Sequence, residues 1–95
     1  LIFSFISLGD TKLELLQSTD SEGTIAKFIR SKGEGIHHIS FEVEDIQAEL
    51  DHLKEEGVKL INEKPYRNAH NEQVAFVHPK STYGILIELM QIKEK

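Results

Sequence analysis

Apolar residues recur at every second position over much of this chain, which is the repeat of a β-strand. The pattern predicts strands at residues 1–8, 12–17, 36–43, 58–61, 73–78 and 85–91. Two segments have helical spacing instead. Thr24 is the predicted N-cap of the first helix, which ends at Gly33, and Asp45 caps the second, which stops at Gly57. Polar residues fill the connection 18–23, the loop 62–72 and the tail 93–95.

The predicted order is therefore β-β-α-β-α-β-β-β, which indicates an α+β fold in a single domain spanning residues 1–95. Residues 36–92 make one complete βαβββ unit. Residues 1–17 form the terminal hairpin of a preceding unit, and residues 18–35 are a linker that contains the first helix. Because this hairpin lacks a helix and a partner strand of its own, we expect the natural protein to have residues upstream of Leu1.

The two hairpins share a sequence repeat. KLELLQ at residues 12–17 matches LIELMQ at residues 86–91, so Glu14 occupies the place of Glu88. Each phrase follows an apolar run and a turn rich in Gly, Ser, Thr and Asp. Internal repeats indicate duplicated structural units, so we predict two equivalent hairpins, each with a glutamate on its second strand.

Glu88 is a carboxylate inside the otherwise apolar run ILIELMQ. Strand alternation places it on the opposite face from Ile87 and Leu89. A half-buried glutamate can lie at a sheet edge exposed to water, form a structural ion pair, or bind a ligand. Because Glu14 repeats the feature, two accidental edges explain it poorly, and the pattern favours a ligand site.

Adjacent histidines occur in GIHHISFEV, and alternation sends them to opposite faces of the strand. The face suited to packing against the two helices carries His37, Ile39, Phe41 and Val43. The polar face carries His38, Ser40 and Glu42. A lone strand histidine is commonly a hydrogen-bonded structural residue, but an imidazole joined by the two repeated carboxylates suits Mn, Co, Ni, Fe or Zn. Two carboxylates aimed into one site repel each other unless a cation or a proton separates them.

Composition narrows the possible functions. The chain has 95 residues, 39% of them hydrophobic, and a formal net charge of −5, which suits one soluble globular domain and gives no basic footprint for nucleic acid. There are no cysteines, which excludes disulfides and thiolate metal sites and fits the reducing cytoplasm. The opening LIFSFISL lacks a basic n-region and a cleavage site, and its eight residues are too few to span a bilayer, so we expect no membrane segment.

KGEGIHHISFEVEDI and VAFVHPKSTYGILIEL closely resemble the methylmalonyl-CoA epimerases, a family of the vicinal-oxygen-chelate (glyoxalase) superfamily. The resemblance covers essentially the whole chain. It implies the glyoxalase fold, in which two βαβββ modules form a cup around a divalent metal (Co, Mn, Ni or Zn). The implied ligands here are Glu14, His38 and Glu88, and the histidine of the first module would lie upstream of Leu1. His38 directly precedes the Ile-x-Phe-x-Val alternation, so it is the match rather than His37, which we assign to packing.

The resemblance also implies an activity, the interconversion of 2R- and 2S-methylmalonyl-CoA by proton abstraction through a metal-stabilised enolate. Glu88 would act as a metal ligand, as a proton-transfer group, or as both, with the partner acid or base upstream. The implied partners are an acyl-CoA substrate and a second copy of the chain, with Leu1, Phe3 and Phe5 as contact candidates. The metal is the one cofactor implied.

Three alternatives remain open from the sequence. Lactoylglutathione lyase uses the same fold and similar ligands, and an extradiol dioxygenase would use a His-His-Glu iron site. A metal-free binding module of the same fold would need no convergent carboxylates. The sequence also departs from the family at Tyr83, Asn68 and Asn71, where small residues or glycines are usual. Lys80 is either a solvated turn lysine or a contact for the CoA phosphates.

Overall fold

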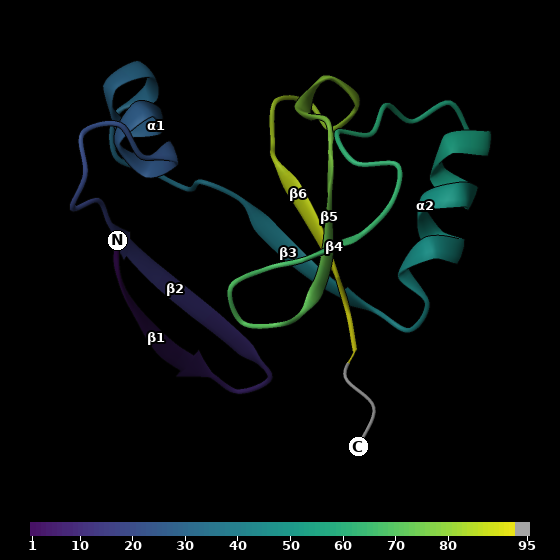
Figure 1. Ribbon diagram of the computed structural model, residues 1–95, viewed down its shortest axis with the longest axis horizontal. Coiled ribbons are helices and arrows are strands. Elements are labelled where there is room, and N and C mark those ends of the chain that lie inside the picture. Colours follow the sequence, from purple (N-terminus) through teal and green to yellow (C-terminus); the bar gives the residue numbers. More distant parts are fainter. Residues whose placement is uncertain (93–95) are drawn as a thin grey trace. The chain divides into compact units, whose positions relative to one another are not determined.

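In the computed structural model, which describes residues 1–92, the chain divides after His37 into two units (Figure 1). The first unit, Leu1–His37, contains β1 (Ile2–Leu8), β2 (Thr11–Gln17) and α1 (Thr24–Lys32). The second unit contains, in chain order, β3 (Ile39–Val43), α2 (Ile46–Glu55), β4 (Tyr66–Arg67), β5 (Gln73–Val77), the 3₁₀ turn η1 (Pro79–Ser81) and β6 (Ile87–Gln91). The predicted α+β class and the βαβββ order of the second unit are therefore confirmed. The predicted tail 93–95 lies outside the described residues.

The first unit is built on an antiparallel hairpin that turns at Gly9, whose φ of +63° is readily adopted by glycine. Its register places Phe5 opposite Glu14. The second unit repeats this arrangement, because Phe76 of β5 lies opposite Glu88 of β6. The sequence repeat thus corresponds to two hairpins with the same cross-strand Phe–Glu pair.

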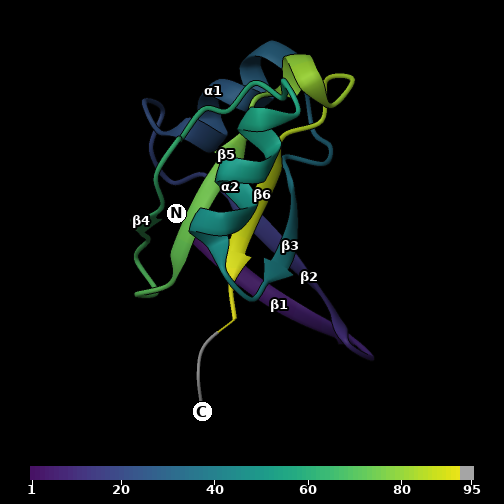
Figure 2. The ribbon, with the colours of Figure 1, turned by 90° about the vertical axis from the view of Figure 1, so that its right-hand side faces the viewer.

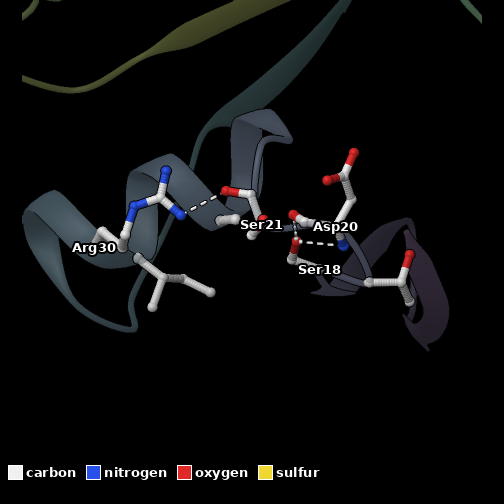
Figure 3. A pocket seen from close by; sticks show the side chains of 7 residues that line it. Ser18, Asp20, Ser21 and Arg30 are labelled. Carbon is white, nitrogen blue, oxygen red and sulfur yellow. Dashed lines mark hydrogen bonds between the residues drawn. The ribbon is translucent and has the colours of Figure 1, made fainter.

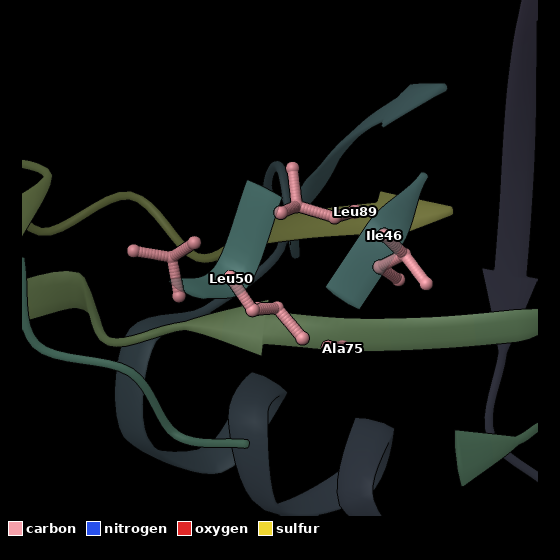
Figure 4. Packing of buried hydrophobic residues seen from close by; sticks show 5 residues of the cluster. Ile46, Leu50, Ala75 and Leu89 are labelled. Atoms are coloured by element: carbon pink, nitrogen blue, oxygen red, sulfur yellow. The ribbon is translucent and has the colours of Figure 1, made fainter. Parts of the chain in front are cut away.

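The second unit is a four-stranded sheet in the order β3-β6-β5-β4, with β3 parallel to β6 and the other pairs antiparallel. Helix α2 packs on β5 and β6, as Figure 2 shows. Its buried side chains meet those of the two strands in one apolar cluster (Figure 4), which consists of Ile46, Leu50, Ala75, Val77 and Leu89. The apolar cluster under α2 therefore lies on one face of the sheet, and Val74, which is also fully buried, lies on the opposite face.

Two polar contacts fix where α2 begins. The Asp45 carboxylate accepts a hydrogen bond from the Ala48 backbone N–H at 3.1 Å, which confirms the predicted N-cap. The Gln91 side-chain oxygen accepts from the Ile46 N–H, also at 3.1 Å, and so ties the helix to the end of β6. The other predicted cap is wrong, because α1 has Gly23 as its N-cap residue and Thr24 is already helical.

Several predicted strand boundaries are also wrong, for reasons visible in the pairing. The strand expected at residues 36–43 begins only at Ile39, because its partner β6 begins at Ile87. The segment 58–61 forms a single bridge, Leu60 to Val77. Beyond that bridge the Asn62 side chain accepts the Phe76 N–H at 2.9 Å and replaces the backbone partner of a regular ladder.

The fourth strand lies instead inside the predicted loop, where Tyr66 pairs with Val74 and Arg67 with Gln73. One packing prediction fails as well. Phe41 was expected to pack against both helices, yet it lies on the edge strand β3, beyond the strands that α2 covers, and is 54% exposed. Within residues 1–92, neither α1 nor α2 has the length and apolar character needed to cross a bilayer.

Candidate functional site

The sheet face opposite α2 carries the predicted site residues of the second unit. Paired residues on neighbouring strands point to the same side, so Ser40, Glu88 and Phe76 form one row across β3, β6 and β5. Leu89, one residue along from Glu88, points into the core under α2. The alternation that buries the apolar half of β6 under α2 therefore brings Glu88 to the opposite face of the sheet.

His38 and Glu88 come together on this face. The His38 Nε2 and Glu88 Oε1 atoms are 3.7 Å apart, and the two side chains are 21% and 14% exposed. The Phe76 ring meets the His38 ring edge-on, with centroids 5.9 Å apart at 78°. Because β6 has neighbours on both sides, Glu88 is not at a sheet edge, and that explanation of the residue is wrong.

The geometry of this pair is compatible with an ion pair when His38 is protonated. It is equally compatible with two donors sharing one divalent ion, because ligand atoms each about 2.1 Å from an ion can lie up to about 4 Å apart. An imidazole nitrogen and a carboxylate oxygen are also the donor types that such ions accept. His38 and Glu88 therefore supply two of the three predicted ligands at a spacing that one divalent ion could bridge.

Glu14 belongs to the first unit, where it is exposed on β2 opposite Phe5. His, Asp and Glu side chains in the described part of the chain form no group of three or more that could hold a metal ion. The structure thus joins His38 with Glu88, and the three-residue set that includes Glu14 stays a prediction.

His37 has packing contacts of its own. Its ring meets the Phe28 ring of α1 edge-on, with centroids 5.1 Å apart at 83°. This contact, made within the first unit, agrees with the packing role predicted for His37. The two adjacent histidines therefore have different environments, although both precede β3, which begins at Ile39.

Tyr66 is a site residue that sequence reasoning missed. It pairs with Val74, which pairs with Met90, and Met90 shares its face with Glu88, so Tyr66 also lies on the site face. Burial raises the pKa of the Tyr66 hydroxyl, and the negative charge of Glu88 raises it further. The available signal was the run of turn residues that separates YR from QV, which is typical of a hairpin.

The departures from the resembled family are explained locally. Asn71 adopts a φ of +61°, which asparagine tolerates better than most residues other than glycine. The Asn68 side-chain oxygen accepts the N–H groups of His70 and Glu72, both at 2.9 Å. Tyr83 is fully exposed with a φ of +55°, an uncommon conformation for a bulky side chain.

A surface pocket lies wholly within the first unit, between the polar connection and α1 (Figure 3). Its lining consists of Ser18, Thr19, Asp20, Ser21, Ala26, Ile29 and Arg30. The Arg30 guanidinium donates to the Ser21 carbonyl, and the Ser18 hydroxyl donates to the Asp20 carbonyl at 2.7 Å. The Arg30 bond joins the connection to α1, the Ser18 bond lies within the connection, and none of the predicted site residues lines the pocket.

Comparison with known proteins identifies the relatives. Residues 2–76 match the family described as the Glyoxalase/Bleomycin resistance protein/Dioxygenase superfamily. Ethylmalonyl-CoA/methylmalonyl-CoA epimerase of Cereibacter sphaeroides is 44% identical over 90 residues, which cover 93% of this chain and 67% of that protein. Mitochondrial methylmalonyl-CoA epimerase of Bos taurus is 39% identical over 88 residues, 92% of this chain and 50% of that protein. The chain thus spans between half and two thirds of the length of these relatives.

A solved structure, methylmalonyl-CoA epimerase in complex with methylmalonyl-CoA and NH4+, is also similar. It superposes with a TM-score of 0.81 at 29% identity, over 94% of this chain and 66% of that one. The likeness extends over both units of the chain, each of which contributes a Phe–Glu hairpin.

The electrostatic contact between Tyr66 and Glu88 predicts a measurable shift. In a Tyr83→Phe background Tyr66 is the one remaining tyrosine, so the ultraviolet absorbance of tyrosinate reports its titration alone. In metal-free protein, Glu88→Gln should lower the pKa of Tyr66, because the charge that raises it is removed. Glu63→Gln, which neutralises an exposed carboxylate paired with Lys54, is the control and should leave it unchanged. An equal pKa in the Glu88 variant and its parent would refute the contact.

Proposed function

The chain belongs to the glyoxalase/bleomycin resistance protein/dioxygenase superfamily, and we propose that it acts as an epimerase that interconverts 2R- and 2S-methylmalonyl-CoA. The observation that carries the proposal is the His38–Glu88 pair, on the face of the four-stranded sheet opposite α2. Support comes from relatives named as methylmalonyl-CoA epimerases, which match nearly the whole chain at 39% and 44% identity.

The reaction requires removal of a weakly acidic proton next to a thioester and its return to the other side of a planar intermediate. Glu88 is the group we assign to proton transfer in this chain. Its carboxylate is held on an interior strand, only 14% exposed, with His38 beside it. The Phe76 ring lies against His38 and shields one side of the pair from water. A rigid, partly dry carboxylate is suited to accept a proton from a bound acyl group.

We also propose that Glu14, His38 and Glu88 contribute to a divalent metal site for Co, Mn, Ni or Zn. When bound, such an ion supplies Lewis-acid stabilisation of the negative charge that develops on the thioester oxygen. The task of the chain is to present an imidazole and two carboxylates in their unprotonated forms. His38 and Glu88 supply two of these donors within one unit, with 3.7 Å between His38 Nε2 and Glu88 Oε1.

A homodimer is the proposed assembly. Leu1, Phe3 and Phe5 are exposed on the first strand, and the rings of Phe3 and Phe5 contact each other edge-on at 5.7 Å. Exposed apolar residues clustered on a hairpin favour association with another apolar surface. The register also places Glu14 on the same face as Phe3 and Phe5, so an interface there would adjoin a proposed metal ligand.

Replacing Glu88 tests the proposed reaction. Glu88→Gln preserves the size of the side chain and should lower the rate of exchange of the substrate C2 proton with deuterated water by about 10²–10⁴-fold. Glu42→Gln, the same change on the same face but at the exposed edge strand, should retain most of the activity. Activity with the hemithioacetal of methylglyoxal and glutathione, and none with methylmalonyl-CoA, would indicate a lactoylglutathione lyase instead.

Metal content tests the ligand assignment. His38→Ala should remove most of the bound divalent metal measured by elemental analysis, because it deletes a donor. His37→Ala, a change at the neighbouring residue that contacts Phe28, should retain the metal. Equal losses in the two variants would contradict the assignment of the two histidines.

Light scattering tests the assembly. The protein at micromolar concentration should have the mass of a dimer, and the double change Phe3→Ser with Phe5→Ser should shift it toward the monomer. Tyr83→Ser removes a fully exposed aromatic residue from the second unit and should have no effect. A monomer at all concentrations of the unmodified protein would contradict the proposal.

A further inference from the structure

We propose that Tyr66 is a substrate-positioning residue whose hydroxyl donates a hydrogen bond to the free carboxylate of the acyl group. This contact would make the site selective for acyl-CoA esters that carry a second carboxylate. The inference rests on the proposed function, because it concerns the ligand of the same site. It adds to the site a residue of β4, which belongs to neither of the two repeated hairpins, β1–β2 and β5–β6.

The sheet register places Tyr66 at a suitable position. Tyr66 and Glu88 lie on the same face, on β4 and β6, with β5 between them. Adjacent strands are about 4.8 Å apart, so the backbones of the two residues are separated by about 10 Å across the sheet, with an offset of two residues, about 7 Å, along the strands. On β5 between them, Val74 is fully buried and Phe76 is partly exposed. A small acyl group resting against Phe76 would have Glu88 on one side and Tyr66 diagonally on the other.

A neutral donor suits the chemistry of the site. The free carboxylate of the acyl group has the same charge as Glu88, so a cation at the proposed metal site and hydrogen-bond donors would both stabilise it there. Tyr66 is 44% exposed, so its hydroxyl remains accessible to a ligand. A tyrosine hydroxyl is protonated, and so able to donate, across the physiological pH range. The next residue, Arg67, cannot replace it, because it alternates to the opposite face and donates to the Asn71 carbonyl at 2.9 Å.

The connection after β4 holds Tyr66 in place. The backbone N–H of Asn68 donates to the Glu72 carbonyl at 2.9 Å and continues the pairing of β4 with β5. The side chain of Asn68 also donates to the Glu72 carboxylate at 3.1 Å. Val74, opposite Tyr66, is fully buried and anchors the other strand. This edge strand of two residues is therefore paired along its length and braced at its C-terminal end, as a positioning role requires.

A pair of ligands tests the role. Methylmalonyl-CoA and propionyl-CoA differ by the free carboxylate, and their dissociation constants can be measured by calorimetry on the whole protein. Tyr66→Phe keeps the ring and removes the hydroxyl, so it should weaken the binding of methylmalonyl-CoA by about tenfold or more. Propionyl-CoA binding should change by less than about twofold, because its acyl group lacks the oxygen that the hydroxyl contacts.

Tyr83→Phe is the matched control, because Tyr83 is fully exposed in the turn before β6, and it should alter the binding of neither ligand. Equal weakening of both ligands by Tyr66→Phe, or no weakening of either, would overturn the inference. A protein that shows the ligand-specific loss but does not exchange the C2 proton would support the role of Tyr66 and refute the proposed epimerase. The two proposals can therefore fail separately.

Discussion

The pairing of β6 between β3 and β5 is the constraint on which the second unit depends. It sends Leu89 into the core under α2 and Glu88 to the opposite face, beside His38. A slip of one residue in this register would exchange the two, burying an uncompensated carboxylate and exposing the apolar contact of the helix. Since β3 runs parallel to β6, the same pairing also decides which residues of the histidine strand reach Glu88. The core and the site are thus specified by one set of hydrogen bonds.

Much of this architecture could be predicted from local patterns, because alternation over five or more residues identifies a strand with little help from its neighbours. The prediction failed where pairing, not composition, decides. Tyr66 and Arg67 form a strand of two residues, too short for a period, whose pairing is completed by the Asn68 turn. Leu60 lies in an apolar segment whose pattern is typical of a strand, yet it forms a single bridge, with Val77. Beyond that bridge the Phe76 N–H donates to the Asn62 side chain, so regular strand pairing does not continue.

The candidate site could be predicted in the same uneven way. The repeated glutamates and the alternation of the histidine strand identified Glu88 and His38, which the fold brings within 3.7 Å. Tyr66 could not be found, because its place on the site face depends on two successive strand registers. Whether Glu14 meets the other two is a question of how two units assemble, and no periodicity within either unit encodes it.

The parallel pairing of β3 with β6 also has a kinetic consequence. Fifty residues of chain separate His38 from Glu88, whereas α2 and the β5–β6 hairpin form through much nearer contacts. Contacts between distant segments close late in folding, because the entropy of the intervening loop must be lost first. We therefore expect the imidazole and the carboxylate to meet only when the unit between them is largely assembled. Nascent or partly unfolded chains would then offer only single donors, which bind metal ions weakly. The ability to bind an ion and to transfer a proton would arise together with the finished fold.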